Sequence, residues 1–253
     1  MERKRVVFGF AYDGTSFSSY QSHNSLNTVE GRIRGEILRN ELGENMRTAS
    51  RTDKNVSALF NTMSLDTSLK PEDVIGILNS SLENVYFHSY GTVPEDFNVR
   101  HCSEKEYTYL LPFSWVNIED FLSEMKKFVG THDFAKFCRF DNKDTTRKIN
   151  SIDTTFWNGI PALVFRSQGF LWNQIRFIVG YGIRRQRDRA ESEDPWSNQK
   201  WSRYLAPAEL LFLTKIEYKD VEMKRIRGIS VEKKIEINRR NTIARNFFYH
   251  NIP

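Results

Sequence analysis

The stretch that organises this chain is Ala49-Ser50-Arg51-Thr52-Asp53-Lys54-Asn55-Val56-Ser57-Ala58. It joins two short apolar runs, and Arg51, Asp53 and Lys54 fall within four positions that hold no apolar residue. A turn between strands needs only a residue such as Asp53 or Asn55, whose side chain can bond its own backbone. A solvated loop is therefore the ordinary interpretation, and the rest of the chain must supply any reason to prefer a functional one.

Length and composition predict one large unit or two packed halves. The chain has 253 residues, of which 39% are hydrophobic, and its 19 Phe residues are ample material for a sheet-based core. The start of the chain lacks a long apolar segment, and no window reaches the length of a membrane span. The sequence therefore predicts a cytoplasmic protein with no membrane partner.

The cysteines and histidines do not suggest a metal site. Cys102 and Cys138 form no CxxC pair, and the five histidines form no HxxxH pattern. A zinc site is therefore not expected. No nucleotide-binding or other cofactor motif is present in the sequence either, so we expect neither a metal nor a cofactor.

The positive charge of the chain lies at its C-terminal end. The formal net charge is +5, and residues 219–253 carry all of it, with nine Lys or Arg against four acids. Residues 1–218 therefore sum to zero. A basic segment favours a polyanionic partner such as a nucleic acid, although a solvated face is the commoner explanation of a charge run.

The first half predicts the element order β-α-β-β-α-β. Val29, Ile33 and Ile37 recur at helical spacing after the capping residue Thr28. Pro71 suits the first turn of a second helix. The predicted strands cover residues 6–12, 47–49, 57–65 and 85–93, and the predicted helices reach from the cap at 28 to 42 and from 71 to 82.

The second half repeats this order, with strands over 107–111, 148–157, 162–168 and 211–218 and helices after Asn117 and from 171 to about 187. Two such copies predict an α+β fold of two ferredoxin-like halves with antiparallel sheets, here divided as residues 1–104 and 105–253. The same order underlies the RRM modules that bind RNA on an open sheet face. The halves share no alignable sequence, so the duplication is inferred from topology alone.

Four segments carry the polar and aromatic residues of interest. Read singly, each segment has an ordinary explanation. Tyr107, for example, shares one strand face with Tyr109 and can pack in a core. Arg176 can lie on a helix surface in the same way. The segments are Tyr12-Asp13-Gly14-Thr15, Arg51-Thr52-Asp53, Lys105-Glu106-Tyr107-Thr108-Tyr109 and Gly169-Phe170-Leu171 with the following Arg176.

Together, in this order and spacing, they resemble the TruA-type tRNA pseudouridine synthases of archaeal kind. That family carries a Tyr-Asp-Gly-Thr segment, a Gly-Arg-Thr-Asp loop, a Lys/Arg-x-Tyr-x-Tyr strand and a Gly-x-Phe-Leu…Arg helix start. The resemblance runs from about Val7 to Leu213. It implies two ferredoxin-like halves, packed side by side with the active cleft between them. It also implies a tRNA substrate modified in the anticodon stem-loop, and a homodimer.

The loop departs from the family pattern at three positions. Ser50 and Asn55 stand where the family usually has Gly, and Ser57 stands where His is common. Gly tolerates a positive φ, and Asn does so best among the other residues. We therefore expect Asn55 to adopt a positive φ and Ser50 to have an ordinary backbone.

The resemblance assigns catalytic roles to Asp53, Tyr107 and Arg176. The Asp53 carboxylate suits the first step, whether it attacks the ribose or takes the C2′ proton, and the sequence leaves both routes open. Arg176 would counter the pKa increase that burial imposes on that carboxylate. The Tyr107 ring would stack on the base, and its hydroxyl would assist loss of the C5 proton.

The remaining expected site residues bind the substrate. Arg51, with Thr52 beside it, would contact the RNA or fill the space of the extruded base. Phe170 and Leu171 would line the pocket and exclude water.

Two other functions compete with this prediction. A non-catalytic RNA-binding or chaperone protein could use the same scaffold, but binding alone would not need Asp53 paired with Arg176 in the site of an anionic ligand. Another base-modifying enzyme is the second alternative. The lack of cofactor and zinc motifs disfavours methyl transfer and deamination.

Overall fold

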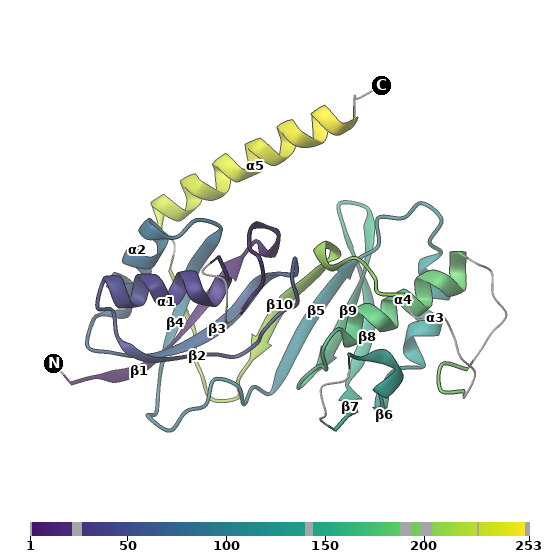
Figure 1. Cartoon of the computed structure of the whole chain (residues 1–253), viewed down its shortest axis with the longest axis horizontal. Helices are drawn as coiled ribbons and strands as arrows, with labels where there is room; N and C mark the ends of the chain where they lie inside the picture. The colour runs from purple at the N-terminus through teal and green to yellow at the C-terminus, as the bar shows by residue number, and fades with distance from the viewer. Residues whose placement is uncertain are drawn as a thin grey trace.

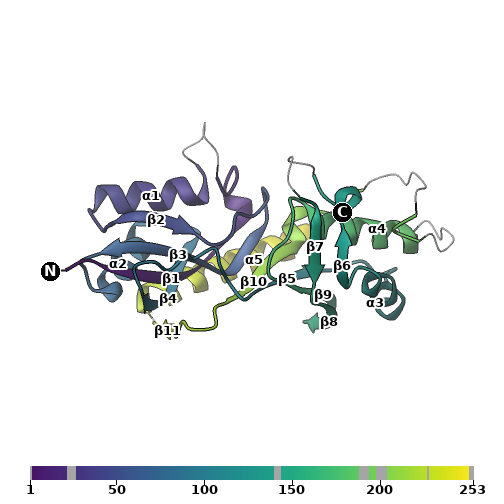
Figure 2. The same ribbon diagram turned by 90° about the horizontal axis from the view of Figure 1, so that it is seen from below.

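Nine strands form one sheet that runs through both halves of the chain (Figure 1). The computed structural model describes residues 2–21, 27–139, 144–187, 194–197, 204–226 and 228–250. The strand order is β11-β4-β1-β3-β10-β5-β9-β8, and β2 also pairs with β3. Figure 2 shows the two halves arranged end to end, with β10 and β5 between them. The chain is thus a mixed α+β protein with a large, mainly antiparallel sheet.

The first half contains the six elements that its sequence predicts. The central strand of this half is β1, which pairs antiparallel with both β3 and β4. The side chain of Thr28 accepts a hydrogen bond from Gly31 N and so caps α1. The bounds are β1 (Lys4–Tyr12), α1 (Val29–Arg39), β2 (Glu44–Thr48), β3 (Ser57–Thr67), α2 (Pro71–Ser81) and β4 (Val85–Val93).

The second half follows the predicted order but differs in detail. The strand predicted over 148–157 is divided, because β7 pairs with β6 in a separate two-stranded sheet while β8 joins the main sheet. The helix predicted from residue 171 begins three residues later, after Asn173 with its φ of 62°. The bounds are β5 (Glu104–Leu110), α3 (Ile118–Lys126), β6 (Gly130–Asp133), β7 (Thr146–Ile149), β8 (Ser151–Trp157), β9 (Ile160–Ser167), α4 (Gln174–Arg187) and β10 (Leu211–Glu217). Short 3-10 turns cover Gly14–Ser16, Ala135–Phe137 and Ala208–Leu210.

The two halves meet where β3 pairs with β10. This pairing is parallel and short, with Ser57 opposite Phe212 and Ala58 opposite Leu213. The strand β5 lies on the other side of β10. The sheets of the two halves are therefore continuous, and the loop before Ser57 is held at the junction.

The segment after β10 returns to the first half. β11 (Lys224–Arg225) pairs with β4, and the helix α5 (Ile229–His250) follows it. Lys234 Nζ donates hydrogen bonds to Asn79 O at 2.6 Å and Leu82 O at 3.1 Å, at the end of α2. Figure 1 shows α5 leaving the first half beside α2 and extending away from the sheet. The basic segment thus contacts the first half, although the sequence grouped it with the second.

Aromatic side chains fill the core on both sides of the junction. Phe8 and Phe87 are buried in the first half, as are Phe121, Phe128 and Phe165 in the second. Within the described ranges, none of the helices combines the length and the apolar character needed to cross a membrane.

Candidate active site

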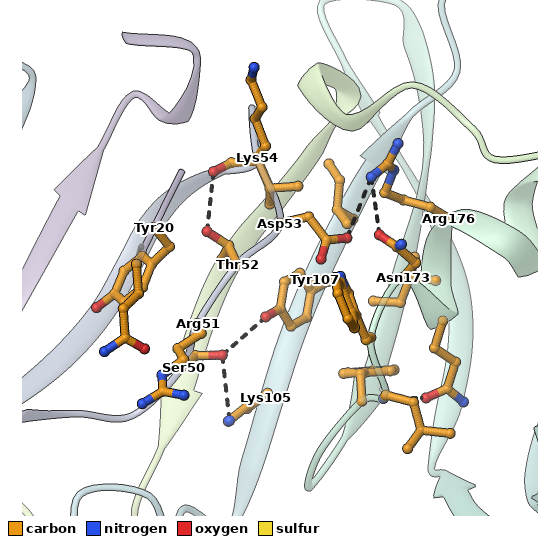
Figure 3. A pocket seen from close by; sticks show the side chains of 18 of the residues that line it. Tyr20, Ser50, Arg51, Thr52, Asp53, Lys54, Lys105, Tyr107, Asn173 and Arg176 are labelled. Carbon is orange, nitrogen blue, oxygen red and sulfur yellow. Dashed lines mark hydrogen bonds and ion pairs between the residues drawn. The ribbon is translucent and has the colours of Figure 1, made fainter. Parts of the chain in front are cut away.

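A pocket of about 720 Å³ lies at the junction of the two halves (Figure 3). Its walls come from the β2–β3 loop, from β5 and from the segment that leads into α4. All seven site residues expected from the sequence line it, namely Arg51, Thr52, Asp53, Tyr107, Phe170, Leu171 and Arg176.

The loop that carries Asp53 is held by bonds to the first-half sheet. The Tyr12 hydroxyl bonds Thr52 Oγ1 at 2.9 Å, and Asn61 Nδ2 donates to Ser50 O at 2.9 Å. Asn55 has a φ of 68°, which confirms the conformation expected of it, and Ser50 is not among the positive-φ residues. The loop is therefore fixed at several points rather than free to move as a simple turn.

The segment Tyr12-Asp13-Gly14-Thr15 packs against the C-terminal end of this loop. Gly14 N donates to Ser57 Oγ at 3.0 Å, and a Cβ at Gly14 would lie 2.0 Å from Val56 O. Only glycine allows this close approach of two backbones. Ser57 thus binds the segment that supports the loop.

Asp53 and Arg176 come from different halves and meet in the pocket. Arg176 Nη1 lies 3.5 Å from Asp53 Oδ2, and the two side chains are only 13% and 17% exposed. Arg176 also donates through Nε to Ala206 O at 2.8 Å and through Nη1 to Asn173 Oδ1 at 3.2 Å. These bonds fix the guanidinium independently of the carboxylate.

Burial decides the ionisation of Asp53. Loss of water raises the pKa of this carboxyl above its ordinary value, and the charge of Arg176 offsets only part of the increase. A carboxylate with a raised pKa is a stronger base than an exposed one. The arrangement therefore suits proton abstraction or nucleophilic attack.

Tyr107 lies on β5 with its ring buried beside Phe170. The ring centroids are 5.3 Å apart with the planes at 84°, so the two rings meet edge to face. The Tyr107 hydroxyl and Ser50 Oγ are hydrogen-bonded at 3.2 Å. Burial raises the pKa of Tyr107 to about 12, so its phenol stays protonated at neutral pH.

The remaining expected residues lie at the walls and the mouth of the pocket. Phe170 and Leu171 are half-buried in the segment that precedes α4, and Arg51 is exposed. Leu171 N donates to Gln174 Oε1 at 2.8 Å, which fixes the segment to the helix start. The pocket thus has an apolar wall on one side and an exposed cation at its entrance.

Several residues of the site were not expected from the sequence. Ser50 and Lys105 line the pocket beside Tyr107, and Asn173 holds Arg176. Lys105 could have been found, because it stands two positions before Tyr107 and so shares its strand face. Asn173 has a positive φ, as Asn residues often do, but residue type alone does not show that its side chain will bond Arg176.

The charges that line the pocket are unequal. Among its described lining residues, Asp53 is the single acid, whereas six are Lys or Arg. The cations are Arg51, Lys54, Arg100, Lys105, Arg147 and Arg176. In the part of the chain that the structure describes, no group of three His, Cys, Asp or Glu side chains is placed to hold a metal ion. The site suits an anionic ligand.

Comparison with known proteins gives consistent matches. A family model described as tRNA pseudouridine synthase matches residues 125–219. The tRNA pseudouridine synthase A of Thermoplasma acidophilum is 36% identical over 224 residues, which cover 88% of this chain and 87% of the relative. The protein of the same name from Picrophilus torridus is 35% identical and covers 88% and 85%. The one from Pyrococcus horikoshii is 33% identical and covers 86% of each.

Proposed function

The chain belongs to the TruA-type tRNA pseudouridine synthases and is an RNA-modifying isomerase, and from this premise we propose that Asp53 performs the first chemical step. The observation that carries this proposal is the largely buried pair of Asp53 and Arg176, 3.5 Å apart, in a pocket whose other charges are cations. The substrate is tRNA, and the proposed target is a uridine of the anticodon stem-loop, by analogy with the family.

The reaction breaks the N-glycosidic bond of uridine, turns the freed base and joins it to the ribose through C5. It neither oxidises nor reduces the substrate. An ionised Asp53 starts it either by attacking the ribose or by taking the C2′ proton. Arg176 keeps the carboxylate ionised under a flipped nucleotide and fixes its direction.

Tyr107 holds the base through the reaction. Its ring offers a stacking surface in the pocket, and its edge-to-face contact with Phe170 keeps that ring in place. The hydroxyl has a secondary role near C5, because it is already bonded to Ser50 and keeps its proton at neutral pH.

Four further residues bind the substrate and shield it. Arg51, exposed at the mouth of the pocket, contacts the RNA or takes the space of the extruded base. Thr52 holds the loop through its bond with Tyr12. Phe170 and Leu171 keep water from the intermediates.

The proposed architecture is two ferredoxin-like halves, residues 1–104 and 105–253, with the C-terminal segment crossing back to the first. The strand orders support it. The first half reads β4-β1-β3-β2 and the second β10-β5-β9-β8, which in each case is the fourth, first, third and second strand of a β-α-β-β-α-β unit. A homodimer is proposed from the family alone.

Asp53→Asn tests the proposed chemistry. The amide is neither a base nor a nucleophile at neutral pH, but it has nearly the same size. We expect position-resolved pseudouridine mapping, by carbodiimide treatment and primer extension, to show no product on tRNA. A binding titration should show unchanged or tighter binding, because a negative charge facing phosphates is gone.

Asp153→Asn is the matched control. This carboxylate is exposed on β8, so its loss makes the same charge change outside the pocket and should leave turnover normal. Full turnover by Asp53→Asn would overturn the mechanism. The positions of the primer-extension stops on tRNA treated with the wild-type enzyme also test the proposed target site. A modified uridine outside the anticodon stem-loop would contradict that part of the proposal.

A further inference from the structure

A group of cations at one side of the pocket has no part in the chemistry described above. It consists of Lys105 on β5 and Arg100 just before it, with Arg147 of β7 also lining the pocket. We propose that Lys105 and Arg100 form a binding site for a phosphate group of the RNA backbone next to the target uridine. The inference rests on the proposed function, since it takes the ligand to be the RNA substrate.

Lys105 is a half-buried cation that is held only by neutral groups. Its Nζ donates to Ala49 O at 3.1 Å and to Ser50 Oγ at 3.5 Å. No carboxylate of the described residues forms an ion pair with it. Burial lowers the pKa of Lys105, which means that its charge lacks compensation. An ammonium group has three N–H donors, so one remains for a ligand.

Arg100 is anchored on the same short stretch of backbone. Its Nε donates to Thr48 O at 3.5 Å, next to the Ala49 carbonyl that holds Lys105. The side chain is exposed, and the bond through Nε leaves the donors of the terminal nitrogens directed elsewhere. A guanidinium suits a phosphate because it can bond two oxygens at once. Both cations line the pocket, and the charge of Arg100 is close enough to lower the pKa of Lys105, so the two lie near each other at the end of β2.

The site lies next to the surface proposed for the base. Lys105 and Tyr107 are two positions apart on β5 and so share one face of the strand. Ser50 Oγ bonds both side chains, and Figure 3 shows Lys105 and Asp53 on opposite sides of Tyr107. A base stacked on Tyr107 would therefore place its ribose toward Asp53, and the strand continuing past Tyr107 would bring a neighbouring phosphate toward Lys105.

The test measures affinity and rate separately, by single-turnover reactions at increasing enzyme and salt concentrations. For Lys105→Met and for Arg100→Gln, we expect the half-saturating enzyme concentration to rise about tenfold, as for a lost charged hydrogen bond. The slope of log affinity against log salt should become shallower by about one for each variant. The rate at saturation should stay within about twofold of wild type, because the proposed contact is to the RNA backbone and not to the atoms that react.

Replacing one phosphate of the RNA by an uncharged linkage identifies the phosphate that the two cations bind. A methylphosphonate beside the mapped uridine should weaken binding by the wild type but cause little further loss for Lys105→Met. Lys4→Met is the control, because this exposed lysine of β1 lies outside the pocket and should give wild-type affinity. A melting curve for each variant confirms that it is folded.

Two outcomes would overturn the inference. If Lys105→Met lowers the saturating rate and leaves the half-saturating concentration unchanged, the lysine acts by positioning Tyr107 through Ser50. If neither variant changes affinity or salt slope, these cations bind no phosphate. Both results leave the role of Asp53 intact, whereas a fully active Asp53→Asn would leave this binding result unaffected.

Discussion

The two halves supply the charged pair of the active site in different ways. The first half presents Asp53 from a loop, where its side chain has one cation contact at 3.5 Å. The second half presents Arg176 from the first turns of a helix, where Ala206 O and Asn173 Oδ1 hold it as well. The arginine therefore keeps two partners without the aspartate, whereas the aspartate would keep its hydrogen bond with the Trp172 side chain but no countercharge. Substitutions on the two sides should have unequal effects.

This asymmetry favours reactivity over stability. Burial outweighs the attraction of Arg176 in the ionisation of Asp53, because its pKa is raised rather than lowered. A carboxylate in a tight, two-point ion pair would be more stable and less basic. The looser contact leaves the aspartate available for a substrate.

The largest loss of stability is expected from Arg176→Gln, which removes the countercharge of the buried carboxylate. Turnover should fall on the order of 100-fold, the size of losing one preorganised charge contact. The free energy of unfolding should fall by about 3 kcal/mol, because an unpaired buried charge remains. Single-turnover kinetics and urea unfolding measure the two losses.

The double variant Asp53→Asn with Arg176→Gln sharpens the same comparison. It should regain most of the lost stability, since no charge is then stranded, and it should stay inactive. Equal losses of stability in Asp53→Asn and Arg176→Gln would contradict the asymmetry.

A second test uses one helix glycine from each half. A Cβ at Gly180 of α4 would lie 1.9 Å from Tyr204 O, in the segment whose Ala206 carbonyl holds Arg176. We expect Gly180→Ala to reduce the free energy of unfolding by about 1–3 kcal/mol and to lower turnover per folded molecule. Denaturant unfolding and active-site titration measure these effects.

Gly35 of α1 is the matched control. No heavy atom lies within 4 Å of a Cβ added there, so Gly35→Ala should raise the free energy of unfolding by about 0.5–1 kcal/mol. If Gly35→Ala and Gly180→Ala destabilised the protein by similar amounts, the close packing of α4 would not explain a difference between the two halves.

A third test separates the ring of Tyr107 from its hydroxyl. Tyr107→Phe keeps the contact with Phe170 and loses the bond to Ser50, so RNA binding should persist while turnover falls in part. Tyr107→Leu should lose about 1–3 kcal/mol of stacking with the base. The half-saturating enzyme concentration measures this difference. If both variants merely unfold, Tyr107 is a core residue and not a binding surface.

The smallest effect is a pH dependence. Activity needs the ionised Asp53, so the acidic limb of the rate profile should lie above the ordinary aspartate pKa of about 3.9. Arg176→Gln should move that limb to higher pH, because the countercharge is gone. A limb in the ordinary range for both proteins would show that Asp53 is not desolvated.

The same pKa shift also predicts a change of stability with pH. The folded state favours protonated Asp53, so this contribution is complete at low pH and is lost as the pH rises through the raised pKa. Asp53→Asn should therefore gain stability relative to wild type between acidic and neutral pH. A constant difference in unfolding free energy would contradict this sign.

Local sequence patterns were sufficient for most of the element order. The strand over 85–93 has the predicted bounds, and Asn55 has the expected positive φ. These features depend on residues close in sequence, whose types limit the backbone directly. The seven expected site residues line one pocket, and they were assigned by the resemblance to the family rather than by local patterns.

The features that the sequence did not predict depend on distant backbone groups. Arg176 bonds the carbonyl of Ala206, and Lys105 bonds the carbonyl of Ala49. Every residue has a carbonyl, so no side-chain pattern identifies which one will be the partner. The two-residue strand β11 and the small β6–β7 sheet were missed for another reason. Their strands are too short to show a hydrophobic periodicity in the sequence.

The return of the chain to its first half has a consequence for how the protein is synthesised and folds. β11 pairs with β4 at Ser89 and Tyr90, and Lys234 bonds the end of α2, yet the whole second half lies between these partners in sequence. The second half is thus an insertion within the first, and its contacts close a long loop that slows folding. During synthesis, β4 stays an open strand edge until the second half has emerged. In that interval an open strand edge is prone to pair with another chain, so a slow second half would raise the tendency of the protein to aggregate.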